Sequence, residues 1–130
     1  MTDANAPWHA HIYYDDAERS AAERLRGGFA EMMAGDEVPI LFIGRMSDRP
    51  VGPHPIPQFE IHFPASAGTT VARTIEESGL RALIHPLTDD DLADHTTLAH
   101  WIGTPIELDV SVLDPPGVNQ GVDRFGRSDF

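Results

Sequence analysis

The chain has 130 residues and a mass of 14.3 kDa, which suits one domain with a single core and is too short for two. Nine basic residues stand against 21 acidic ones, and the net charge of −12 disfavours binding to nucleic acid or to anionic membrane surfaces. The absence of cysteine excludes disulfides, thiolate nucleophiles and iron–sulfur clusters, so a metal would need nitrogen or oxygen ligands. Seven histidines are the compositional feature that requires an explanation.

The first third of the chain predicts a strand, a helix and a second strand. Residues 1–7 contain neither a cationic start nor an apolar run, so we expect a flexible N-terminus without a secretory signal, in a cytoplasmic protein. Residues 8–14 alternate between apolar and polar side chains, as in a strand. Residues 15–34 carry apolar side chains at helical spacing, and the apolar run 38–46 predicts a buried strand.

The middle of the chain begins with a stiff loop. Residues 47–57 contain four prolines, which prevent regular structure and keep the backbone extended. Residues 59–64 alternate and predict a third strand. Residues 69–78 have helical spacing and stop before a glycine, and residues 81–86 predict a fourth strand.

The last part of the chain predicts one more helix. Thr88 and Asp91 have the spacing of a capping box, which would open a helix ending near residue 103. Residues 107–113 alternate and predict an edge strand, whereas residues 114–130 are rich in proline, glycine and polar side chains and predict a loosely ordered tail. We therefore expect a single domain over residues 8–113.

This order of elements predicts an α+β fold, a ferredoxin-like βαββαβ sandwich with an additional C-terminal helix. Two helices would cover the apolar face of the sheet. In the usual strand order the first and third strands are central neighbours and the fourth flanks the first. Several polar side chains would then gather on the opposite face: His9, His11, Tyr13, Glu60, His62 and His85.

Imidazole and carboxylate groups together suggest a metal site. Iron(II), manganese and zinc accept these ligands at about 2.0–2.2 Å, and non-haem iron oxygenases use two histidines and one carboxylate. Each residue also has a structural interpretation: a histidine on a sheet face can be hydrogen-bonded or solvated, Glu60 can be a surface carboxylate, and Tyr13 can lie in a dimer interface. His100 is expected to pack within the last helix.

His54 stands on the proline-rich loop, where prolines on both sides would hold a catalytic acid or base in place at low entropic cost. A simple turn residue is the alternative. For His95, inside the last predicted helix, structural and functional roles both remain open.

Four segments carry a resemblance to a known family: HAHIYYD (9–15), VGPHPIPQFEIHFP (51–64), HPLTDDDLADHTTLAHWIG (85–103) and LDVSVL (108–113). Together they resemble the DOPA 4,5-dioxygenase family over about residues 8–113. The resemblance implies a small ferredoxin-like homodimer. In the characterised fungal members, it implies an extradiol dioxygenase that opens the catechol ring of L-DOPA with non-haem iron(II) and dioxygen. The histidine-bearing motifs of the family fall on His11, His54, His62, His85 and His95.

From this resemblance we expect His11, His62 and His85 to bind the metal, with Glu60 as a candidate carboxylate ligand. His54 would serve as the acid or base, and His95 would act beside it, supporting a ligand or contacting the substrate. We expect Tyr13 to contact the substrate, and Arg45 and Arg49, on either side of the start of the proline loop, to bind a substrate carboxylate. His9 has no role in this set and is interpreted as incidental. Zinc or nickel can replace iron(II) in such a site during purification.

Two other functions fit the same sequence. One is a non-catalytic ferredoxin-like dimer that binds a small aromatic ligand, and the other is a cofactor-free monooxygenase of the dimeric α/β-barrel kind. Metal analysis followed by a catechol assay distinguishes the three.

Overall fold

The computed structural model describes residues 3–127 and contains a five-stranded antiparallel sheet with the strand order β2-β3-β1-β4-β5. The predicted α+β class is confirmed. The strands are β1 (Pro7–Tyr13), β2 (Phe42–Ile43), β3 (Gln58–Pro64), β4 (Arg81–Pro86) and β5 (His100–Ile102). The α-helices are α1 (Arg19–Gly35), α2 (Gly68–Ser78), α3 (Asp91–His95) and α4 (Gln120–Asp123), and the 3₁₀ turns are η1 (Ala65–Ala67) and η2 (Val110–Val112).

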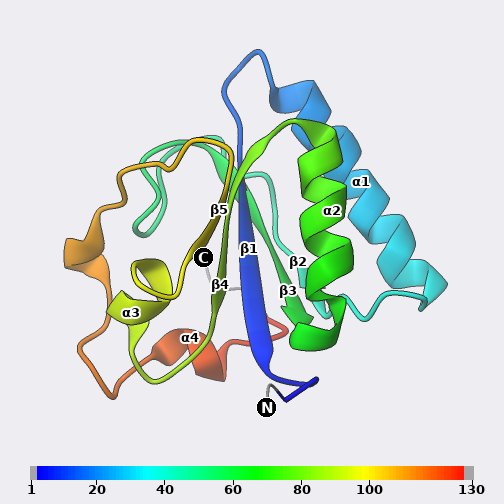
Figure 1. Cartoon of the computed structure of the whole chain (residues 1–130). Coiled ribbons are helices and arrows are strands. Elements are labelled where there is room, and N and C mark those ends of the chain that lie inside the picture. The colour runs from blue at the N-terminus through cyan, green and yellow to red at the C-terminus, as the bar shows by residue number, and fades with distance from the viewer. Residues whose placement is uncertain (1–2, 128–130) are drawn as a thin grey trace.

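Helices α1 and α2 lie side by side against one face of the sheet (Figure 1). Helix α1 buries Ala22, Leu25 and Phe29, whose helical spacing places them on the side that meets the strands. Helix α2 is capped by Gly79, which adopts φ 77°, a left-handed conformation that glycine reaches without steric cost. The apolar side chains of the central strands meet these helices in one core: Ala10, Ile12, Phe59, Ile61, Phe63, Ala82 and Ile84.

The opposite face of the sheet is covered by irregular segments instead of long helices. Figure 1 shows α3, α4 and the long connections between β4 and the C-terminal part of the chain on this side. The polar side chains that project here are therefore buried, and every residue of β3 is buried. Below we call this side of the sheet the polar face.

Antiparallel pairing aligns the side chains of the polar face in rows. His9 is paired with His62 on β3 and with His85 on β4, which makes one row of three histidines. The next row joins His11 to Glu60 across β1 and β3. The predicted neighbour relation of the first, third and fourth strands is confirmed, and it is this relation that gathers the polar residues.

The helix predicted over residues 88–103 is wrong. Only residues Asp91–His95 are helical, and His100–Ile102 instead pair with β4 as the edge strand β5. The capping assignment also changes: Asp90 is the N-cap and accepts a hydrogen bond from Ala93 N at 3.0 Å. The Thr88 hydroxyl donates to Asp94 Oδ1 at 2.6 Å. Two β-branched threonines follow His95 and disfavour further helix, so pairing with the edge of β4 prevails.

Two predicted strands are also corrected. The strand predicted over residues 38–46 is restricted to Phe42–Ile43. Gly44 N still donates to the Glu60 carbonyl at 2.7 Å, whereas the Gly44 carbonyl accepts a hydrogen bond from Arg26 Nε at 2.8 Å. The edge strand predicted over residues 107–113 is absent from the described residues. The Asp109 side chain accepts a hydrogen bond from Ser111 N at 3.1 Å and caps the turn η2 there.

The predicted loose tail carries the short helix α4 and folds back over the polar face. Asn119 Nδ2 donates to Asp94 Oδ2 at 2.9 Å and to the Thr88 carbonyl at 2.7 Å, and Gly126 N donates to His62 Nδ1 at 3.0 Å. Residues 128–130 of this tail and residues 1–2 of the predicted flexible N-terminus lie outside the described residues. Within residues 3–127, no helix has the length and apolar character needed to cross a bilayer.

Candidate metal centre and its cavity

A cavity of about 160 Å³ opens between the polar face of the sheet and the segments that cover it. Five of the seven histidines line it: His9, His11, His54, His85 and His95. Apolar groups from Pro53, Leu87, Val112 and Leu113 complete part of the wall. The cavity therefore combines several nitrogen donors with a partly apolar lining, as small-ligand sites do.

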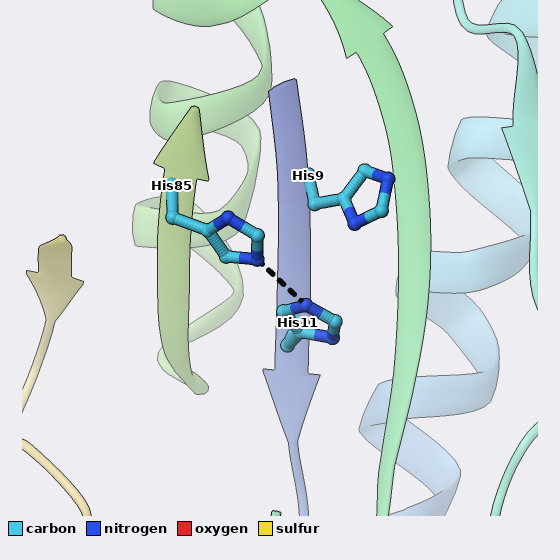
Figure 2. Close-up of side chains that lie close together, drawn as sticks. All are labelled: His9, His11 and His85. Atoms are coloured by element: carbon cyan, nitrogen blue, oxygen red, sulfur yellow. Dashed lines mark hydrogen bonds between the residues drawn. The ribbon is translucent and has the colours of Figure 1, made fainter. Parts of the chain in front are cut away.

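Three of these histidines form a compact group. His9 and His11 project from β1 and His85 projects from β4, with their rings on the same side of the sheet (Figure 2). Each offers one ring nitrogen, and the three nitrogens lie within 4.8 Å of one another. All three side chains are 1% exposed, so this group is separated from bulk solvent.

Hydrogen bonds to oxygen atoms fix which nitrogen of His11 and His85 carries the proton. His11 Nδ1 lies 3.0 Å from Gln58 Oε1, and His85 Nδ1 lies 2.8 Å from the Pro86 carbonyl oxygen. These oxygens accept hydrogen bonds, so we assign the proton of each neutral ring to Nδ1. His95 follows the same pattern, because its Nδ1 donates to the Asp91 carbonyl at 2.8 Å. All three Nε2 atoms consequently carry lone pairs.

The Nε2 atoms of His11 and His85 face each other at 3.1 Å. With the protons on Nδ1, two lone pairs meet there, which is unfavourable unless a cation or a proton lies between them. Burial disfavours a proton, and it is the largest cause that lowers the pKa values of both histidines well below their ordinary range. A metal ion that draws on both lone pairs removes the repulsion, so the donor set fits a metal.

Burial likewise lowers the pKa values of His9 and His54, and the charges of neighbouring histidines lower them further. These rings are therefore neutral at pH 7 and available as ligands or hydrogen-bonding groups. His9 Nε2 has no hydrogen-bond partner among the described residues, although the side chain is buried. A buried nitrogen of this kind is suited to an additional ligand.

His54 differs from the other cavity histidines in its hydrogen bond. Its Nδ1 lies 2.7 Å from the hydroxyl oxygen of Tyr13, a group that can donate. Its ring lies beside that of His11, with 4.1 Å between the centroids. Tyr13 itself is 1% exposed and does not line the cavity. Burial raises the pKa of its phenol, so Tyr13 is neutral.

Glu60 and His62 form a second group with His9, on the side of β1 away from β4. Glu60 Oε2 lies 3.3 Å from His62 Nε2 and 3.9 Å from His9 Nδ1, and the rings of His9 and His62 stack at 3.8 Å. This group also has distances compatible with a metal. However, Gly126 N donates to His62 Nδ1, so the proton of that ring is assigned to Nε2, where it faces Glu60. Neither Glu60 nor His62 lines the cavity.

The predicted arginines lie elsewhere. Arg45 and Arg49 are exposed and do not line the cavity, whereas Arg124, in the tail that sequence reasoning treated as loose, does. The sequence prediction also omits Gln58 and assigns no role to His9. For both, the signal was present, since two-residue alternation places Gln58 with Glu60 on β3 and His9 with His11 on β1. No sequence pattern pointed to Arg124.

Comparison with known proteins identifies the family of this chain. The model of the Dopa 4,5-dioxygenase family matches residues 8–112. This chain belongs to the Dopa 4,5-dioxygenase family. A curated DOPA 4,5-dioxygenase from Amanita muscaria is 32% identical over 111 residues, which cover 82% of this chain and 49% of that protein.

An uncharacterized 21.2 kDa protein from Botryotinia fuckeliana is 32% identical over 113 residues, covering 79% of this chain and 61% of that protein. The chain thus spans about half to three fifths of the length of these fungal relatives. Among solved structures, a candidate dioxygenase from Nostoc punctiforme superposes with a TM-score of 0.73 at 31% identity. The match covers 86% of this chain and 96% of that one, so the similarity extends to nearly the whole of a comparable fold.

Proposed function

We propose that this protein is a metal-dependent extradiol dioxygenase that cleaves the ring of L-DOPA or a related catechol in the histidine-lined cavity. Family membership and the relatives named as dioxygenases support the reaction class. The observation that carries the proposal is the 3.1 Å separation of His11 Nε2 and His85 Nε2, with both rings holding their protons on the far nitrogen. Such an arrangement is suited to a metal ion.

We assign His9, His11 and His85 as the metal ligands. They line the cavity, whereas Glu60 and His62 do not. The sequence prediction of Glu60 and His62 as ligands is replaced in this proposal by a supporting role: the carboxylate lies beside His9 Nδ1 and His62 Nε2, where it favours a proton on each. His95, whose ring centroid lies 4.2 Å from that of His85, stands next to the ligands.

Iron(II) is the metal we propose, with zinc or nickel able to replace it in purified protein. When bound, iron(II) supplies a Lewis acid for the catechol oxygens and a redox centre for dioxygen. Catechol and dioxygen balance the reaction by themselves. One ring carbon–carbon bond next to the diol breaks, both atoms of dioxygen enter the product, and the two new ends become an aldehyde and a carboxylic acid.

The chain's own residues bind the aromatic ring and the polar groups of the substrate. Pro53, Leu87 and Leu113 provide apolar surface for the aromatic ring and exclude water from part of the cavity. His54, predicted as the acid or base, lines the same cavity, where its ring can donate a hydrogen bond to a catechol oxygen. Arg124 replaces Arg45 and Arg49 in our proposal as the partner of a substrate carboxylate, because it is the arginine that reaches the cavity wall.

The experiment that tests this function combines metal analysis with a catechol assay. The full chain is stripped of metal, loaded anaerobically with iron(II), and mixed with L-DOPA and air. We expect a yellow ring-opened product from the iron-loaded protein only. His11→Ala should lose both bound iron and product formation, and His100→Ala, which alters an exposed residue of β5, should retain both. Product formation without metal would indicate the cofactor-free monooxygenase. Absence of product from the iron-loaded protein would leave the aromatic-binding module.

Three further expectations remain proposals. We propose a ferredoxin-like assignment for the β2-β3-β1-β4 part of the sheet, a cytoplasmic location and a homodimer. Exposed apolar side chains on the covering segments support a contact between copies, with Val112 55% exposed and Val118 51% exposed. Light scattering during size-exclusion chromatography measures the mass in solution, and a mass near 14 kDa would contradict the dimer.

A further inference from the structure

Tyr13 is buried beside the metal-site histidines without reaching the cavity. It is the last residue of β1 and is paired with Gln58 on β3, one row beyond His11 and Glu60. Gln58 Oε1 accepts a hydrogen bond from His11 Nδ1, and the Tyr13 hydroxyl is hydrogen-bonded to His54 Nδ1 at 2.7 Å. This third row is therefore a polar layer behind the histidines, in which each side chain contacts one imidazole.

The direction of the hydrogen bond between Tyr13 and His54 follows from burial. A buried hydroxyl group that donates to no acceptor destabilises the fold more than an unused lone pair on the same oxygen does. Among residues 3–127, His54 Nδ1 is the acceptor placed within hydrogen-bond distance of this hydroxyl. Tyr13 therefore donates and Nδ1 accepts.

Acceptance at Nδ1 has a consequence for the other ring nitrogen. A neutral imidazole carries one proton, so His54 must carry it on Nε2. His11, His85 and His95 have the opposite arrangement, because their Nδ1 atoms donate to oxygen. Of these four rings in the cavity wall, three therefore have an Nε2 lone pair and one, His54, has an Nε2–H group.

The loop around His54 restrains its backbone as well. His54 and Val51 exchange two backbone hydrogen bonds, of 3.0 and 3.1 Å, and the Pro53 carbonyl accepts a third from Asp109 N at 2.9 Å. Prolines on both sides limit the conformations of this segment further. With the backbone held in this way, the Tyr13 hydroxyl needs only to fix the rotation and the proton of the ring.

We propose that Tyr13 is a positioning residue that holds His54 as the Nε2–H tautomer, so that His54 donates a hydrogen bond from Nε2 to an oxygen in the cavity and does not bind the metal. The catalytic part of this inference rests on the proposed dioxygenase function. The tautomer of His54 does not, because it follows from the hydrogen bond alone.

The test compares Tyr13→Phe with Tyr14→Phe. Both remove one hydroxyl from adjacent tyrosines, but the Tyr14 hydroxyl donates to Asp48 and its ring belongs to the core beneath α1 and α2. The proton of His54 is located by ¹H–¹⁵N spectra of the imidazole nitrogens in the metal-free full chain at neutral pH. The signals of His54 are assigned by their disappearance in His54→Gln.

We expect Nε2–H in the wild type and in Tyr14→Phe, and loss of this preference in Tyr13→Phe. A wild-type His54 with its proton on Nδ1 would overturn the proposal even if Tyr13→Phe does not fold. An unchanged tautomer in a folded Tyr13→Phe would overturn it as well.

Kinetics of the iron-loaded protein test the catalytic part. Tyr13→Phe should lower kcat by at least about tenfold with little change in KM or in iron content, since loss of one positioned hydrogen-bond donor typically costs about 10²–10³-fold. Rates equal to those of Tyr14→Phe would refute this role. If the wild type opens no catechol ring, the dioxygenase function fails, while the spectra still decide whether Tyr13 sets the tautomer of His54.

Discussion

His11 Nε2 and His85 Nε2 lie 3.1 Å apart, on adjacent antiparallel strands and in the wall of the cavity. The oxygen partners of both Nδ1 atoms turn the two lone pairs toward the same point. The two lone pairs therefore repel each other in the metal-free chain, and the same arrangement becomes favourable when both nitrogens coordinate a cation.

Removal of either ring should abolish tight metal binding. We expect His85→Ala to weaken binding by more than about 100-fold, because even the partners behind metal ligands contribute about 10–100-fold. The metal content after dialysis, measured by mass spectrometry of the elements, checks this. His100→Ala is the matched control, and a His85→Ala protein with full metal content would contradict the assignment.

Gln58 should increase the metal affinity through its hydrogen bond with His11, although Gln58 itself is not a ligand. Gln58→Leu removes the acceptor that keeps the His11 proton on Nδ1. We expect metal affinity to fall by about 10–100-fold. Gln58→Glu keeps an oxygen at this position and should retain most of the affinity. Competition with a chromophoric chelator measures both variants, and equal affinities for the leucine and glutamate variants would disprove the role of Gln58.

The metal-free protein should lose stability in mild acid. The pKa values of His9, His11, His54 and His85 lie well below 6.5 in the folded chain, mainly because these rings are buried, and return to about 6.5 on unfolding. Below pH 6.5 the unfolded chain therefore binds more protons than the folded one. The contribution of these rings to stability is complete above pH 6.5 and decreases as the pH falls.

Urea unfolding in the presence of EDTA at several pH values measures this effect. Each extra proton taken up on unfolding changes the free energy of unfolding by about 1.4 kcal/mol per pH unit. A free energy that stays constant from pH 7 to pH 5 would show that the rings titrate normally in the folded chain. Excess zinc should reduce the loss, because metal binding keeps the ligands unprotonated.

Gly44 supports the second group of polar side chains by leaving room for it. A Cβ at this position would lie 3.0 Å from Glu60 Cγ and 3.3 Å from the Glu60 carbonyl oxygen. Gly44→Ala should destabilise the fold by about 1–3 kcal/mol, the usual cost of overpacking. Gly27→Ala is the control, because a Cβ there meets nothing within 4 Å and the helix α1 should gain about 0.5–1 kcal/mol. Thermal denaturation measures the melting temperature of both variants, and equal shifts in melting temperature would refute the close packing at Gly44.

The sequence alone predicted the elements whose signal is local. Alternation in residues 8–14 and 59–64 fixes which side chains of β1 and β3 share a face, because successive strand residues point to opposite sides. The helices α1 and α2 have regular apolar spacing and were predicted close to their observed bounds. Residues 88–103 were not, because the side-chain bonds of Thr88 and Asp90 and pairing with β4 outweigh helical spacing there.

The candidate site was predicted as a set of residue types on one face, and that set depended on two-residue periodicity and on the resemblance. Only the tertiary structure decided which of these residues line the cavity and which lie beside it. Strand pairing places His9 between His62 and His85, and a residue interpreted as incidental becomes the centre of a row. The protons of His11, His54 and His85 are set by Gln58, Tyr13 and the Pro86 carbonyl respectively, and two of these three partners lie far away in sequence.

The amino-acid composition, with seven histidines, no cysteine and a negative net charge, determined that a metal site would use nitrogen and oxygen ligands. It could not determine which histidines present a lone pair and which present an N–H group. That difference depends on what lies behind each ring, and long-range strand pairing brings those partners into place.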